Sequence, residues 1–222
     1  MRKKYEFTGK EKVVDGVILK QIKAIISFGV IESGTIGGWI EKETNLSHYG
    51  NAWVSGNARV RDDAIVSENA VVSENTIVGG SAWVRGNAVV NGNARVSENA
   101  VVNGNAIVGE NAIVSENAWV SGNAVVNGNA WVSGNARVNG NAWVSGNARV
   151  FRDKDYATID GFGASTITFF KCADGKIRLN CLKFNGTIDE YREYIHGTMK
   201  VKNVNEYLML ADLMDYHFKN ED

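Results

Sequence analysis

Residues 93–110 read NARVSE-NAVVNG-NAIVGE, three consecutive copies of the hexad Asn-Ala-x-Val-x-Gly/Glu. The hexad runs without a gap from 51 to 152, seventeen times in all. Its fourth residue is Val in every copy. Its second is Ala except for Thr76, and its first is Asn except for Asp63 and Ser81. A repeat this regular decides the architecture, because every unit must adopt the same local structure.

A period of six fits short strands separated by corners. Residues two apart in a strand point to the same side, so positions two and four face inward and positions three and five face outward. Position six accepts Gly, Glu and Asp alike, which indicates that it does not require a positive φ. Position one is nearly always Asn, the non-glycine residue that best tolerates the left-handed backbone region. We therefore expect the left-handed residue of each corner at position one. Stacked coils should align these Asn side chains into amide ladders.

Read from its valine, the hexad is V-x-G/E-N-A-x, which resembles the hexapeptide repeat of left-handed parallel β-helices. The stretch 19–54, LKQIKAIISFGVIESGTIGGWIEKETNLSHYGNAWV, is similar to the segment that precedes the repeats in uncharacterised bacterial and phage hexapeptide-repeat proteins. The left hand comes from this resemblance, since parallel crossovers generally prefer the right hand. We expect an all-β solenoid, a left-handed parallel β-helix of about six to seven triangular coils, each of about 18 residues.

The flanking segments are predicted to cap the open ends of the solenoid. Residues 1–34 form an N-terminal β cap, a hairpin that turns at Asp15-Gly16. Its excess of Lys and Arg also fits a binding tab for an acidic partner. Residues 35–152 form the β-helix, which begins with an irregular coil and a short insertion at 35–50.

Residues 153–222 are predicted to form a small α+β domain that is again a cap. Segments 166–172 and 176–184 alternate around Asp174-Gly175, a hairpin pattern. Thr187 and Glu190 form a capping box that opens a helix. A second helix is expected to start at Asn203, with an apolar face made of Tyr207, Leu208, Leu210, Ala211, Met214 and Phe218.

Composition limits the chemistry. The net charge is −1, and the hexads balance seven Arg against seven acidic residues, so we expect no nucleic-acid partner. No run approaches the ~18 apolar residues of a membrane span, and the first residues lack a signal-peptide core. Two Cys without CxxC spacing fit a reducing cytoplasm and no zinc site. Corners with Asn rather than Asp argue against calcium, so no metal is expected. No cofactor is expected either.

Any function must lie in the outward positions, because the inward ones are uniform. Position three forms columns spaced three hexads apart, and one column is apolar throughout: Trp53, Val71, Val89, Ile107, Val125 and Trp143. The remaining two columns mix Arg with apolar residues and include Trp83 and Trp119. Contiguous apolar surface marks an interface, so these eight residues are the predicted protein-binding site. The apolar column could also reflect the β-propensity of Val, Ile and Trp, or lie under the C-terminal helices.

These features favour a non-catalytic binding or scaffold protein whose partner is another protein, a second copy, or both. The resemblance to phage proteins implies an inhibitor or modulator of a host protein. The alternative is an acyltransferase using acetyl-CoA or another acyl donor, as in hexapeptide-repeat enzymes, with His48 as general base. The hexads contain no histidine, and Cys172 with His196 matches no nucleophile signature, which weakens the enzyme hypothesis. A third hypothesis is a structural spacer.

Overall fold

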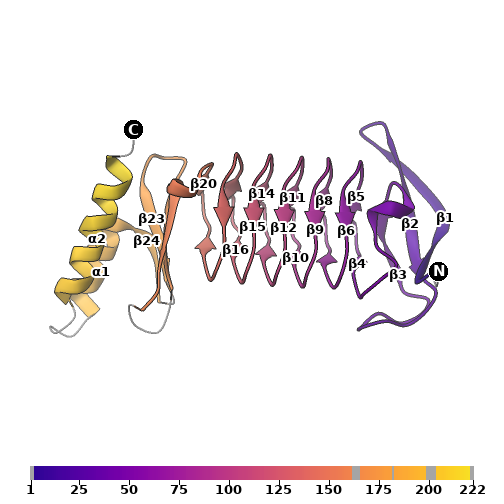
Figure 1. Cartoon of the computed structure of the whole chain (residues 1–222), viewed down its shortest axis with the longest axis horizontal. Helices are drawn as coiled ribbons and strands as arrows, with labels where there is room; N and C mark the ends of the chain where they lie inside the picture. The colour runs from indigo at the N-terminus through magenta and orange to yellow at the C-terminus, as the bar shows by residue number, and fades with distance from the viewer. Residues whose placement is uncertain (1–2, 162–165, 182, 199–203, 221–222) are drawn as a thin grey trace.

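The computed structural model describes residues 3–161, 166–181, 183–198 and 204–220. The molecule is elongated, with an N-terminal group of strands at one end, a stack of coils in the middle and two helices beyond a small sheet at the other end (Figure 1). The seventeen hexads each supply one two-residue strand, and these strands form three parallel sheets that are the walls of a β-solenoid.

We name each wall by the number of strands in its sheet. The six-stranded wall contains β4 (Trp53–Val54), β7 (Val71–Val72), β10 (Val89–Val90), β13 (Ile107–Val108), β16 (Val125–Val126) and β19 (Trp143–Val144). The five-stranded wall contains β6 (Ile65–Val66), β9 (Trp83–Val84), β12 (Val101–Val102), β15 (Trp119–Val120) and β18 (Arg137–Val138). The nine-stranded wall contains three N-terminal strands and β5 (Arg59–Val60), β8 (Ile77–Val78), β11 (Arg95–Val96), β14 (Ile113–Val114), β17 (Trp131–Val132) and β20 (Arg149–Val150).

Each strand pairs with the strand three hexads later, in the next coil, as Val89 does with Ile107. The inward Ala and Val side chains are fully buried along the whole stack and make one continuous core. Burial of two apolar side chains per hexad drives coil formation. The predicted β-solenoid with three hexads per coil is therefore confirmed.

The corner residue in the left-handed region is at position six, so the prediction of position one was wrong. Asp62 and the glutamates at position six have φ between 55° and 62°, and the glycines there have φ between 60° and 73°. Three of these six carboxylates make a compensating interaction. Asp62, Glu68 and Glu74 each accept the backbone N–H of the position-six glycine one coil later, at 2.8–3.0 Å. This charge-assisted bond offsets the cost of a left-handed non-glycine residue.

The predicted amide ladders are confirmed. Position-one Asn side chains donate from Nδ2 to the Oδ1 of the Asn 18 residues later, at 2.9–3.2 Å. One ladder follows a single corner through Asn51, Asn69, Asn87, Asn105, Asn123 and Asn141. Each interior Asn thus both donates and accepts, which explains why the residue recurs at a solvent-facing corner.

The N-terminal cap consists of β1 (Tyr5–Val14), β2 (Val17–Ala24), β3 (Ile36–Ile40) and the 3₁₀ helix η1 (Glu43–Asn45). The first two strands form the predicted hairpin, with Val14 opposite Val17 and positive φ at both turn residues. In β3, Ile40 pairs with Val60, and Leu46 bridges Val66, both 20 residues apart. The expected insertion is therefore two residues long and follows Leu46.

Side chains of this cap satisfy backbone carbonyls at the exposed edge of the first coil. The buried Lys4 ammonium donates to Ala52 O at 2.7 Å and to Gly50 O at 3.4 Å. The buried Asn45 side chain donates to Asp62 O and Ala64 O at 3.0 and 2.8 Å. An open solenoid end would leave such groups unpaired, so these contacts terminate the sheets.

The C-terminal domain contains η2 (Asp153–Asp155), an antiparallel sheet and two helices. The sheet consists of β21 (Tyr156–Ile159), β22 (Ile167–Lys171), β23 (Ile177–Cys181) and β24 (Phe184–Thr187). The helices are α1 (Ile188–Thr198) and α2 (Val204–Lys219). The predicted hairpin and both helices are confirmed, although Asn203 lies outside the described residues; the outer strands β21 and β24 were not predicted.

The capping box of α1 forms as expected, since Thr187 N–H donates to Glu190 at 2.7 Å and Glu190 N–H donates to Thr187 Oγ1 at 3.2 Å. The helices cover one side of the small sheet, where the predicted apolar face of α2 joins a second, separate core. Neither α1 nor α2, among the residues described, has the length and apolar character needed to cross a membrane.

This domain caps the last coil with its own side chains. Thr168 Oγ1 accepts Trp143 N–H at 2.9 Å, and Asn180 Nδ2 donates to Trp143 O at 2.9 Å. Asp155, which is buried, accepts the N–H groups of Phe151 and Arg152 at 3.0 Å each. Both ends of the solenoid are thus closed by hydrogen-bonding side chains.

Candidate protein-binding wall

The predicted apolar column exists as a physical column. Its six residues occupy the outward position of consecutive strands in the six-stranded wall, in register from β4 to β19. Val71, Ile107 and Trp143 are 37%, 41% and 41% exposed, and Val89 and Val125 are half-buried between them. At ~4.8 Å per coil, the exposed part from Val71 to Trp143 is about 19 Å long.

Trp53 is the exception in this column. It is only 2% exposed, because the N-terminal loop lies over it and Phe28 meets its indole edge-on at 5.5 Å between ring centroids. The prediction that Trp53 belongs to the protein-binding site is therefore corrected: its ring is part of the capped core. The exposed column starts one coil later, at Val71.

The indole of Trp143 leans along the wall. Its Nε1 donates to Asn127 Oδ1 of the preceding coil at 3.3 Å. Trp119 makes the equivalent bond to Asn103 at 3.4 Å on the five-stranded wall. Because these bonds join adjacent coils, each ring is held to the wall and its polar edge is satisfied. A partner would therefore meet preordered aromatic surface.

The six-stranded wall carries no charge on the outward positions of β7 to β19. Its position-three residues are the apolar column, and its position-five residues are Ser73, Asn91, Gly109, Asn127 and Ser145. The nearest charges are corner glutamates, of which Glu68 and Glu74 are already bonded to backbone N–H groups. An uncharged, flat wall loses little hydration energy when a partner covers it.

The remaining two walls are chemically different. The nine-stranded wall alternates apolar residues with Arg59, Arg95 and Arg149, and the Arg149 guanidinium donates to Ala148 O at 2.8 Å. The five-stranded wall exposes Trp83 and Trp119 but also carries Arg85 and Arg137. The predicted additional binding residues Trp83 and Trp119 thus lie on a wall separate from the apolar column.

The C-terminal helices leave the column uncovered. They stand beyond the end of the stack, separated from the last coil by the small sheet (Figure 1). Trp143, in the coil nearest to them, keeps 41% of its surface exposed. Among the described residues, cover by these helices is therefore excluded as the reason for an apolar column.

His48 is held inside the N-terminal cap. Its imidazole stacks on Tyr5 with 4.3 Å between ring centroids. Lys4 N–H donates to Nδ1 at 3.3 Å, so Nε2 carries the ring proton of the neutral tautomer and lies 2.8 Å from Glu43 Oε1. The Lys3 and His48 side chains lower the pKa of that carboxyl. Both ring nitrogens are engaged within the protein, so these contacts would have to break before the imidazole could accept a proton from an acceptor substrate.

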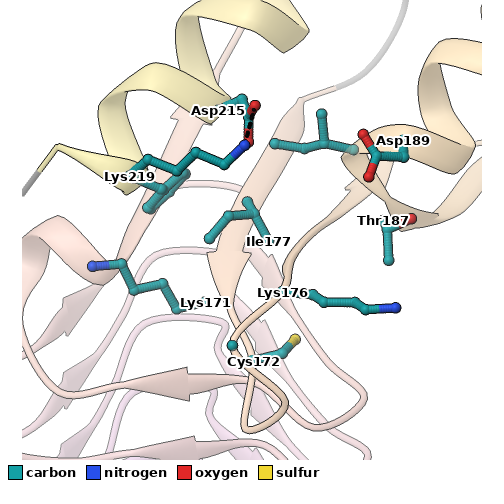
Figure 2. Close-up of a pocket in the computed structure, with 11 residues that line it drawn as sticks. Lys171, Cys172, Lys176, Ile177, Thr187, Asp189, Asp215 and Lys219 are labelled. Atoms are coloured by element: carbon teal, nitrogen blue, oxygen red, sulfur yellow. Dashed lines mark hydrogen bonds and ion pairs between the residues drawn. The ribbon is translucent and has the colours of Figure 1, made fainter.

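A pocket of about 320 Å³ lies between β22, β23 and the helices (Figure 2). Its charged rim includes Lys171, Lys176, Asp189, and Asp215, which pairs with Lys219 at 2.7 Å. Cys172 lines the pocket, but burial raises the pKa of its thiol, which disfavours the reactive thiolate. His196 is not among the lining residues, so this pocket does not pair Cys172 with His196.

Sequence reasoning missed the polar residues that close the ends of the solenoid. Lys4, Asn45, Asp155, Thr168 and Asn180 carry no periodic signal, because each is used once. Their role follows only from the three-dimensional position of the coil edges. The repeat itself predicted that such edges must be capped, but not by which side chains.

Comparison with known proteins supports the repeat assignment. The family model described as "YdcK Beta solenoid repeat" matches residues 94–110, 118–134 and 130–146. A curated relative, "Uncharacterized acetyltransferase YdcK" of Escherichia coli (strain K12), is 44% identical over 50 residues, which are 22% of this chain and 14% of the relative. The similarity thus concerns a small part of both chains. Together with the 18-residue register of the walls, it supports the resemblance of the repeats to the hexapeptide-repeat β-helix superfamily.

Proposed function

We propose that the protein is a non-catalytic binding scaffold whose six-stranded wall, from Val71 to Trp143, is the contact surface. The observation that carries this proposal is an exposed, uncharged and flat apolar column on one wall of a prism whose remaining two walls carry arginine. Burying one such Val or Ile side chain contributes about 1.5–3 kcal/mol. Several aligned residues therefore provide enough apolar surface for protein contact, with Trp143 as the anchor.

Within this function, the bound protein would be inhibited or modulated by being covered, because the wall offers contact surface and no reactive group. The rigid stack supports this role: each coil is hydrogen-bonded to the next, so little conformational entropy is lost on binding.

The test is affinity capture from the native host with the double variant Val89→Asp/Ile107→Asp. The matched control is Val101→Asp/Ile113→Asp, which places the same charges on the remaining two walls. Both substitutions lie at outward positions, so the inward core is unchanged in either variant. A protein captured by wild type and by the control but lost with the first variant supports the proposal. A protein captured equally by all three contradicts it.

Acyl transfer is the second candidate, favoured by the name of the E. coli relative, an acetyltransferase. Such chemistry needs a base near the acceptor, and His48 is the histidine closest in sequence to the repeats. Calorimetric titration with acetyl-CoA, comparing wild type with His48→Ala, tests this candidate. Saturable acetyl-CoA binding that is lost in the variant would favour the enzyme. Absence of a heat signal would reject it.

A further inference from the structure

We infer that the six-stranded wall binds a second copy of this chain, face to face and antiparallel, about a two-fold axis at Ile107. This inference rests on the proposed function, because it names the partner of the same wall. It follows from three properties of the wall: its periodicity, its lack of charge and the order of its residues.

Periodicity favours a like partner. The outward residues recur at every coil, ~4.8 Å apart, over about 19 Å. A surface matches this repeat over its whole length only if it has the same period, and a second solenoid wall has it by construction. Two sheets that pack face to face lie ~10 Å apart with interdigitating side chains, which is the arrangement that this column permits.

The order of residues favours the antiparallel orientation. In that orientation Trp143, the largest residue, lies opposite Val71 of the second copy, and Val89 lies opposite Val125. Ile107 lies opposite itself. The one large side chain of the column, Trp143, then meets a small one, and the other pairs are of equal size. In a parallel pair Trp143 would meet Trp143 and Val71 would meet Val71, which crowds one end and leaves a gap at the other.

Electrostatics permits this pairing. No charged side chain occupies an outward position of this wall from β7 to β19, so no charge is buried. The closest like charges are the exposed corner residues Glu110 of the two copies, beside the axis. Their repulsion is screened by salt, so association should strengthen as ionic strength rises.

The area of the wall limits the affinity of the dimer. A wall about 19 Å long and about 16 Å wide, taking five residues of each hexad at ~3.3 Å each, buries roughly 300 Å² per copy before protruding side chains are counted. A stable interface buries at least ~1,200 Å² in total. The dimer is therefore weak and concentration-dependent.

Sedimentation velocity from about 1 µM to 1 mM measures the association directly, bracketing the range expected of weak complexes. Wild type should shift towards the dimer with rising concentration, and Ile107→Asp, which places two carboxylates on the axis, should remain monomeric. The control Val101→Asp should behave as wild type. A wild type that stays monomeric throughout overturns the inference of a dimer. The proposed binding function is contradicted by a different result, in which wild type and Val89→Asp/Ile107→Asp capture the same protein equally.

Orientation is tested by cysteine cross-linking in a Cys181→Ser background, with a bismaleimide that spans the ~10 Å between packed sheets. Ile107→Cys should cross-link to itself. Val71→Cys should not, because its two copies lie about 19 Å apart along the axis. Val101→Cys, on the five-stranded wall, is the negative control. Cross-linking of Val71→Cys as efficiently as Ile107→Cys would indicate a parallel pair and overturn the antiparallel arrangement.

Discussion

At the residue scale, position six of the hexad accepts several residue types although its backbone lies in the left-handed region. Both Gly and Glu adopt positive φ there. Their interchange in the sequence suggested an ordinary conformation, because side-chain variety usually signals backbone freedom. Gly avoids the steric cost of the left-handed region, and Glu68 and Glu74 offset that cost by accepting a backbone N–H of the next coil.

We expect Gly122→Ala to lower the free energy of unfolding by about 1–2 kcal/mol. Gly122 has φ of 68°, and an added Cβ would lie 2.9 Å from Gly140 N. Alanine would gain no carboxylate bond in return. Chemical denaturation measures the change, with Ser121→Ala at the adjacent position as control. Equal stability of Gly122→Ala and wild type would contradict this account of the corner.

Lys4 provides a pH-dependent prediction. The residue is 1% exposed, and burial lowers the pKa of its ammonium to about 8. In the unfolded chain the pKa is about 10.4, so between pH 8 and 10 the unfolded state binds more protons. The free energy of unfolding should therefore rise with pH in this window.

Thermal melts from pH 7.5 to 9.5 test this effect. Wild type should gain stability with rising pH, while Lys4→Met should show no such gain. The control is Lys3→Met, which removes an exposed neighbour paired with Glu43 and should keep the wild-type slope. A wild type that loses stability over this range would show that Lys4 does not titrate as described.

At the element scale, the strands of the solenoid could be predicted and the caps only in outline. Hexad periodicity determined which residues are inward, because an inward position must be small or aliphatic in every coil. The hairpins at Asp15-Gly16 and Asp174-Gly175 and the capping box at Thr187 are local signals, and all three formed. Strands β21 and β24 lack such signals, because they are held by pairing with β22 and β23.

The C-terminal cap depends on Asp155. Burial alone would raise the pKa of this carboxyl, but Arg152, the Phe151 N–H and Lys171 outweigh burial and lower it. Asp155→Asn should reduce the free energy of unfolding by about 1–3 kcal/mol, because charge-assisted bonds to two N–H groups are weakened.

Because the folded-state pKa of Asp155 lies below its unfolded value, its contribution is present above about pH 4 and is lost as pH falls further. Denaturation at pH 7 and at pH 3 compares the protein with the Asp155 carboxyl ionised and with it largely protonated. The difference between wild type and Asp155→Asn should be largest at pH 7 and should shrink at pH 3. A constant difference would mean that the carboxylate charge is not what stabilises the cap.

At the scale of the whole molecule, the column of outward apolar residues could be predicted because it depends only on the 18-residue register. The cover over Trp53 could not, because it depends on how the loop before β3 packs against the first coil. For the same reason, sequence could not show that His48 is engaged at both ring nitrogens. Periodic features were visible in the sequence, and contacts between non-repeating segments were not.

The six-stranded wall is the proposed binding surface. Photo-cross-linking in the native host, with benzoylphenylalanine at position 89 on this wall or at position 101 on the five-stranded wall, tests it most directly. We expect a discrete adduct from position 89 and none from position 101, with an adduct of twice the chain mass if the partner is a second copy. Adducts of equal yield from both walls, or none from position 89, would contradict it.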